Sequence, residues 1–293
     1  MSSSTVGGLL VEEDEVEDEV QAKSSGEVVP PVLGGGSART YVPLKAKHLV
    51  RLVQKMSHAK PLKLSGMDLQ GLSLCGMDLT GARLFRCDLR GVDFQWANLT
   101  EATLTDCNLT GANLKGANMR EVQLASTNLT RANLSGANLH LARLGKAQLR
   151  RANLSGANLE EAQLEDADLR QANLANAKMT KANLMHADLR EANLSGAVML
   201  RADLRSAILR RADLSGAALP NVELQRASLR RANLTGANLT WATLTDADCT
   251  QANLSGANLS GADLSNSTLT GVKLSEAKLH GFPPTKLPQG FQP

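Results

Sequence analysis

The amino-acid sequence predicts an all-β solenoid built of four-sided coils, and two observations support this prediction. A five-residue pattern repeats from Leu64 to Leu279 without insertion or deletion. Its central position holds a large apolar residue, and the position two residues earlier holds a small apolar one, usually Ala. A period of five fits neither the period of a helix, about 3.6, nor that of a strand, about 2. The chain must therefore turn a corner in every unit.

The corner itself is predicted from the second residue after each centre, which is Gly in many units. A type II turn requires a positive φ at this position, and Gly adopts it without steric cost. Pro220 lies one residue earlier in its unit, at the first central turn position, where its fixed φ is suitable. Four short extended segments joined by four such corners close a coil of twenty residues.

The best-formed unit, Ala152-Asn153-Leu154-Ser155-Gly156, closely resembles the motif of the pentapeptide-repeat family. That motif is a small residue, Asp or Asn, Leu or Phe, then Ser, Thr or Arg, and Gly. The resemblance covers residues 62–281. It implies a right-handed quadrilateral β-helix in which the centre and the small residue of each unit point inward. About eleven coils, each rising about 4.8 Å, would make a rod roughly 50 Å long.

The flanks of the repeat differ from it in composition. Residues 1–40 contain prolines, glycines and a dense acidic run, which is typical of a disordered arm. Residues 41–61 carry apolar side chains at helical spacing and are predicted to form an amphipathic helix that caps the first coil. A basic helix lying on an anionic membrane is the alternative for this segment. Residues 282–293 cannot continue the repeat and are expected to cover the last coil.

The repeat offers no constellation for catalysis, and we expect a non-enzymatic protein that uses no cofactor and no metal. The five His share no coil, and no phosphate-binding glycine loop is present. Cys87 and Cys107 stack one coil apart, so a disulfide between them is one interpretation. The other is that both are small apolar residues of the core. No secretory leader or membrane span is recognisable, and a cytoplasmic location is therefore expected.

Folding the sequence at a period of twenty places ten arginines on one outer face, which we call the arginine face. Five of them share one unit position in successive coils and are expected to form a ladder with about 4.8 Å between rungs. Like charges at this spacing repel one another. The ladder comprises Arg150, Arg170, Arg190, Arg210 and Arg230, and the face also carries Arg90, Arg131, Arg151, Arg211 and Arg231.

Three interpretations of this face are open. It is a solvated surface on which Asp168, Asp188 and Glu191 relieve the repulsion, or it binds an acidic protein, or it binds nucleic acid. The absence of aromatic residues from the ladder argues against single-stranded nucleic acid. The chain itself supplies a further acidic candidate, because residues 1–40 hold eight acids and two bases. As a tethered ligand, that arm would have a high effective concentration at the face.

A second outer face carries apolar side chains on adjacent coils. Exposed apolar patches of this kind often mark a contact with a partner or with a second copy of the chain, and Trp is a favoured anchor in interfaces. The patch comprises Val198, Leu200, Ala218, Pro220 and Trp241.

Taken together, these features predict a non-enzymatic binding or scaffold protein that presents a rigid rod surface to an unidentified protein partner, for which an acidic protein is one candidate. The alternative is a nucleic-acid-associated or topoisomerase-modulating protein that acts through its charged face. The family resemblance implies this alternative, because some bacterial members resemble duplex DNA and protect DNA gyrase from inhibitors. Those rods are acidic on the relevant surface, whereas this sequence predicts a basic face.

Overall fold

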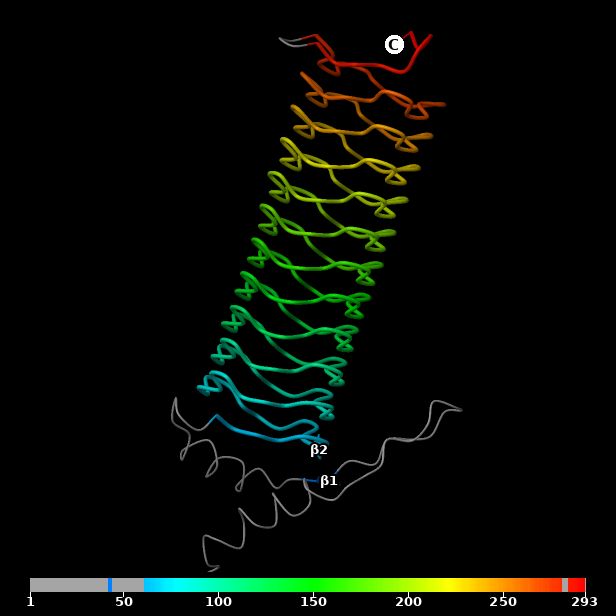
Figure 1. The fold of residues 1–293 in the computed structure, drawn as a ribbon. Coiled ribbons are helices and arrows are strands. Elements are labelled where there is room, and N and C mark those ends of the chain that lie inside the picture. Colours follow the sequence, from blue (N-terminus) through cyan, green and yellow to red (C-terminus); the bar gives the residue numbers. More distant parts are fainter. Residues whose placement is uncertain (1–41, 44–60, 281–283, 293) are drawn as a thin grey trace, which may run out of the picture.

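The computed structural model describes Val42–Pro43, residues 61–280 and residues 284–292 of the 293-residue chain. These residues form a straight rod of stacked coils with the N-terminal end of the repeat at one tip and the C-terminus at the other (Figure 1). Parallel bridges join residues twenty positions apart, from Lys63↔Arg83 to Asn258↔Lys278. One coil therefore takes twenty residues, as the five-residue period predicts.

Most pairings between coils are isolated bridges of one residue, but two segments of the described chain form short strands. Strand β1 is Val42–Pro43 and strand β2 is Met67–Asp68. They pair in parallel, with Val42 opposite Met67. Strand β1 falls in the segment for which we expected a capping helix, so its first residues are extended instead. The rest of that segment, residues 44–60, and the acidic arm lie outside the described residues. Within the described residues, no helix occurs.

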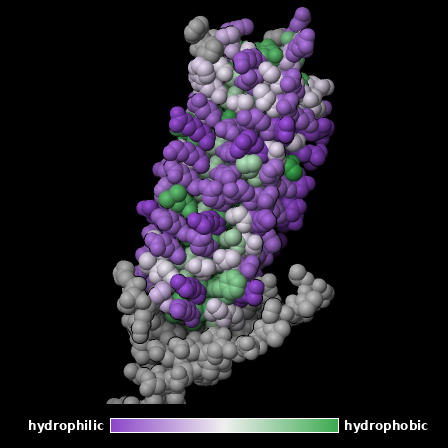
Figure 2. Space-filling view, in the orientation of Figure 1, coloured by the Kyte–Doolittle hydropathy of each residue, from purple (hydrophilic) through white to green (hydrophobic). Residues whose placement is uncertain are grey.

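The core is a continuous shaft of Leu and Ala side chains along the rod axis. In the unit around Leu154, the centre is 0% exposed and Ala152 is 1% exposed. Asn153 and Ser155 are half-buried and Gly156 is exposed, so the inward and outward positions predicted from the sequence are confirmed. Each buried Leu contributes roughly 1.5–3 kcal/mol to stability. Hydrophilic side chains dominate the face of the rod that Figure 2 shows.

Backbone hydrogen bonds tie each coil to the coils above and below it. The Leu154 amide donates to the Asn173 carbonyl at 2.7 Å, and the Asn153 amide donates to the Ala132 carbonyl at 2.9 Å. The same pair of contacts recurs along the rod. Because each coil bonds only to its neighbours, stability accumulates coil by coil, as in other solenoids.

The corners are the predicted type II turns. The Ala157 amide donates to the Leu154 carbonyl at 3.0 Å, and Gly156 between them has a φ of +64°. Every unit from Gly66 to Glu276 has a positive φ at this position, including many units in which the residue is not Gly. An L-residue in this conformation is strained by about 1 kcal/mol. The buried shaft offsets this repeated local strain.

Asn and Asp before each centre form hydrogen bonds in two directions. The Asn153 side-chain oxygen accepts from the Ser155 amide at 3.2 Å, which secures the start of the turn. Its side-chain nitrogen donates to Asn133 at 3.3 Å, and Asn173 donates to Asn153 at 3.2 Å. An amide ladder therefore runs along the face centred on Leu154.

All four cysteines are free, so the core interpretation of Cys87 and Cys107 holds rather than the disulfide. The Cys87 thiol donates to the Leu64 carbonyl at 2.7 Å, and the Cys107 thiol donates to the Leu84 carbonyl. Burial raises the pKa of the Cys249 thiol to about 12, which keeps it protonated at neutral pH.

The C-terminal segment pairs with the last coils through a parallel bridge, although the five-residue pattern has already ended at Leu279. Lys286 bridges to Asp263, an offset of 23 residues instead of twenty. The Leu264 amide donates to the Lys286 carbonyl at 2.8 Å, and the side chains of Leu287 and Phe291 pack against the core. The five-residue sequence pattern ends before this segment, as we expect from the sequence. The parallel backbone ladder nevertheless extends into the segment, which the sequence does not predict.

Leu154→Asp is expected to lower the free energy of unfolding by more than about 4 kcal/mol, because it places a charge without a partner in a dry shaft. Ser155→Asp, one residue away and facing solvent, is expected to change it by less than about 0.5 kcal/mol. Thermal melts of the two variants measure the difference. Equal melting temperatures would show that the inward positions are wrongly assigned.

Two glycines give a matched test of the turn. Gly156 has a positive φ and Gly145 does not, and a Cβ at either position meets no atom closer than 3.9 Å. Gly156→Ala is expected to destabilise the rod by about 1 kcal/mol through backbone strain. Gly145→Ala is expected to stabilise it by about 0.4–1 kcal/mol, because Ala restricts the unfolded chain. Denaturant unfolding gives both values, and changes of the same sign would contradict the account.

Candidate anion-binding face

The arginine face lies along one column of backbone bridges. This column runs from Asp68 at β2 through Gln148, Asp168 and Asp188 to Thr268. Each ladder arginine follows a column residue by two positions, so the structure places all five on one face, as the sequence predicts. Their side chains are accessible: those of Arg170 and Arg190 are 38% and 44% exposed.

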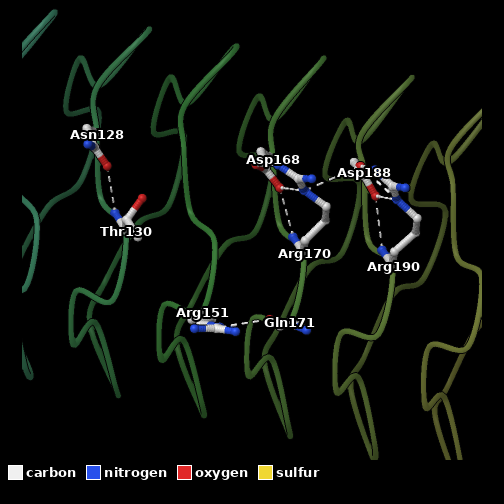
Figure 3. A network of polar contacts seen from close by, with 8 residues as sticks. All are labelled: Asn128, Thr130, Arg151, Asp168, Arg170, Gln171, Asp188 and Arg190. Atoms are coloured by element: carbon white, nitrogen blue, oxygen red, sulfur yellow. Dashed lines mark hydrogen bonds and ion pairs between the residues drawn. The ribbon is translucent and has the colours of Figure 1, made fainter.

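Two rungs of the ladder fold back onto acids of their own unit (Figure 3). Arg170 donates from Nε to Asp168 Oδ1 at 2.7 Å and from Nη2 to Oδ2 at 2.6 Å. Arg190 contacts Asp188 in the same two-pronged manner, with Nε 2.8 Å from Oδ1. Each carboxylate also accepts the backbone amide of its arginine, at 3.1 Å for Arg170. These acids therefore secure the turn and bind the guanidinium at once.

The ion pairs change the proton affinity of their members. The hydrogen bond from Arg170 holds the pKa of Asp168 below its ordinary value, although burial opposes this. The same contact raises the pKa of Arg170, and Asp188 raises the pKa of Arg190. In each pair, the carboxylate neutralises the positive charge of the guanidinium that it contacts. These two guanidinium groups are already occupied by carboxylates.

Other arginines of the face lack such an acid. Arg150 follows Gln148 and Arg210 follows Ile208, and within the described part of the chain neither forms an ion pair. Arg151 donates to the neutral side chain of Gln171 at 2.8 Å (Figure 3). Arg231 likewise donates to Gln251, at 2.7 Å.

The result is two basic clusters rather than the uniform ladder that the sequence suggests. The proximal cluster comprises Arg131, Arg150 and Arg151, and the distal cluster comprises Arg210, Arg211, Arg230 and Arg231. Between them, the two units of this face that are centred on Leu169 and Leu189 carry three acids and two arginines. In the distal cluster, Arg230 lies 3.2 Å from Asp248 and Arg211 lies 3.8 Å from Glu191. The proximal cluster forms no ion pair within the residues described.

The structure brings four residues of the predicted apolar patch together on adjacent coils, namely Val198, Leu200, Ala218 and Pro220. The ring of Trp241 lies against Gly261, on the side of its coil away from these four. Val198 and Leu200 are 40% and 37% exposed, and Trp241 is 54% exposed. Val198 bridges to Ala218 in the next coil, and Pro220 is half-buried beside them. The patch lies half a coil away from the distal cluster, on the opposite side of the rod. Trp96, which is also exposed, belongs to a different face, where its ring lies against Gly116.

One surface feature was missed from the sequence, a groove of about 590 Å³ on a third face. It forms because Ala125 and Gly145 occupy a unit position where larger side chains stand in other coils. Its rim includes Glu121 and Glu161, which pair with Arg120 at 2.8 Å and with Lys181 at 3.1 Å. The sequence signal was the pair of small residues, one coil apart. Its acids are engaged with neighbouring side chains, and we assign it no ligand.

The described residues include no group of three or more His, Cys, Asp or Glu placed to hold a metal ion. Among the same residues, none forms a helix of the length and apolarity that crossing a bilayer requires.

Family comparisons agree with this architecture. The family models for the pentapeptide repeat region and for pentapeptide repeats match residues 77–154 and four stretches within 147–281, together more than half of the chain. The protein therefore belongs to the pentapeptide-repeat family, and its rod is a right-handed β-helix.

Solved structures include similar rods. The chain is 32% identical to HetL, a pentapeptide repeat protein involved in heterocyst differentiation regulation in the cyanobacterium Nostoc, over 84% of this chain and 98% of that one, with a TM-score of 0.48. It is 21% identical to a trypsin-treated variant of QnrB1, a plasmid-mediated fluoroquinolone resistance protein, over 60% and 91% of the two chains, with a TM-score of 0.50. The second likeness concerns the fold alone. Among curated proteins no significant match was found.

Proposed function

We propose that this protein is a non-enzymatic scaffold that binds an acidic protein partner through the arginine face. The observation that carries the proposal is the pair of basic clusters whose arginines largely lack acidic partners within the described residues. Stacked about 4.8 Å apart, such cations repel one another, and a bound anion relieves that repulsion. Guanidinium groups also bind carboxylates through two parallel hydrogen bonds, which gives geometric specificity.

The charge pattern favours a protein over nucleic acid as the partner. A duplex presents an unbroken line of phosphates, whereas the middle of the face carries Asp168, Asp188 and Glu191 against two arginines. An acidic protein that places carboxylates opposite the two clusters avoids those acids. Binding of nucleic acid remains the alternative function, and the same experiment separates the two.

A second contact is proposed at the apolar patch. Because it lies on the side of the rod opposite the arginine face, an acidic partner and an apolar contact do not compete for space. The apolar contact is either a second protein or another copy of this chain. This arrangement supports a scaffold role, since a rigid rod holds its two ligands at a fixed separation. We expect the protein to act in the cytoplasm.

Arg150→Gln combined with Arg210→Gln is expected to weaken binding of a poly-glutamate peptide about tenfold at low salt, because two charged hydrogen-bond donors are lost. The matched control is Arg143→Gln with Arg201→Gln, which removes the same charge from two other faces of the rod and should cost less than about twofold. Fluorescence anisotropy titrations on the full chain measure both.

Equal losses in the two double variants would contradict the proposal, because net charge alone would then explain binding. A wild-type chain that binds duplex DNA tightly and ignores poly-glutamate would favour the nucleic-acid alternative instead.

A further inference from the structure

Strand β1 enters the rod at the foot of the arginine face. Val42 pairs with Met67 and Pro43 pairs with Asp68. Asp68 is the first residue of the bridge column that carries Gln148, Asp168 and Asp188 farther along the rod. Strand β1 therefore lies at the N-terminal end of the rod, on the same face as the two basic clusters.

The preceding chain is long enough to return along this face. Strand β1 lies four to five coils from the proximal cluster, which is about 19–24 Å. Residues 20–41 separate β1 from the acidic run at residues 12–19. For 22 residues treated as a random coil, the root-mean-square end-to-end distance is roughly 26 Å, close to the distance required.

The acidic run matches the two clusters in the number of charges and in overall length, since eight extended residues span about 23 Å and the two clusters together span five coils, about 24 Å. Glu12–Glu15 are four acids, Val16 interrupts them, and Glu17–Glu19 are three more. The distal cluster has four arginines and the proximal cluster three. The midpoints of the two acidic groups lie about 15 Å apart in an extended chain, and those of the two clusters lie about 19 Å apart. The length of the arginine side chain covers the difference.

We propose that residues 12–19 dock lengthwise on the arginine face, with Glu17–Glu19 on the proximal cluster and Glu12–Glu15 on the distal cluster. The orientation follows from the connection to β1, which lies nearer the proximal cluster than the distal one. Residue 19, which is closer to β1 in the sequence, is therefore placed at the proximal cluster, and residue 12 at the distal cluster. This inference rests on the proposed function, because it assumes that the face binds acidic chains. It adds regulation, since an external acidic partner must displace the chain's own segment.

The docked geometry can be tested by distance measurements between nitroxide labels on the full chain. Cys75 is exposed and the other cysteines are buried, so Cys75→Ser gives a suitable background. With one label at Thr250→Cys, on the far side of the distal cluster, a second label is placed at Val11→Cys or Val20→Cys. We expect a short, narrow distance for Val11 and a distance longer by about 30 Å for Val20, the extent of nine extended residues.

Broad distributions from both label pairs would overturn the proposal, and so would the reverse order of the two distances. Replacing the four distal arginines by Gln should broaden the Val11 distribution. A distribution unchanged by that substitution also overturns the proposal, because the contact would not depend on the cluster.

A competition experiment measures the regulatory consequence. In the full chain, the seven acids of residues 12–19 are replaced by Gln or Asn, and a labelled peptide copy of residues 12–19 is added in solution. If the tether supplies an effective concentration of about 1 mM and the peptide binds at about 0.1 mM, neutralising the arm should raise peptide affinity about tenfold. The matched control is Glu27→Gln, the one remaining acid of the arm, which should leave the affinity unchanged.

The outcomes separate the two proposals. If the peptide binds wild-type and neutral-arm chains equally, and Arg150→Gln with Arg210→Gln weakens both, the face binds acidic chains but the segment does not occupy it. If the peptide binds neither chain, the proposed function fails together with the self-docking.

Discussion

The parallel backbone ladder between residues twenty apart is the constraint on which the rest of this structure depends. It superimposes the same unit position of successive coils, so every side chain lies directly above its counterpart, as Leu154 lies above Leu134. Leucines therefore stack into a shaft and asparagines into an amide ladder. The same stacking places arginines directly above one another, where their like charges repel. A repeat of this kind concentrates charge on one face unless neighbouring residues correct it.

On the arginine face, the residue before each centre decides whether the arginine two positions later is neutralised. Where Asp precedes the centre, as in Asp168 and Asp188, the arginine two residues later folds back and is neutralised. Where Gln148 or Ile208 takes that position, the guanidinium has no acid in its unit. The character of each outer face is thus set by a few exceptions to the repeat. The same holds for the patch, where Val198 and Ala218 replace the usual Asn.

The sequence predicts the coil, the inward residues and the turns, because a strict period restricts the backbone almost regardless of the outer side chains. It does not predict the pairing of β1, since Val42–Pro43 lies outside the repeat and 25 residues from its partner. The bridge at Lys286 is missed for the same reason. The division of the ladder into two clusters depends on three non-acidic residues that precede unit centres, Gln148, Ile208 and Ser228. The sequence alone does not predict this division, because it does not show that an arginine binds the Asp two residues before it.

Insertion of whole units tests most directly whether register governs function. One unit, Ala-Asn-Leu-Ser-Gly, inserted after Gly196 should preserve the shaft but turn the distal cluster away from the face of the proximal one. Four units should keep both clusters on one face, about 4.8 Å farther apart. We predict similar melting temperatures for the two variants and affinity for an acidic peptide reduced about tenfold only in the first. Equal affinities, or unfolding of the one-unit variant, would contradict the account.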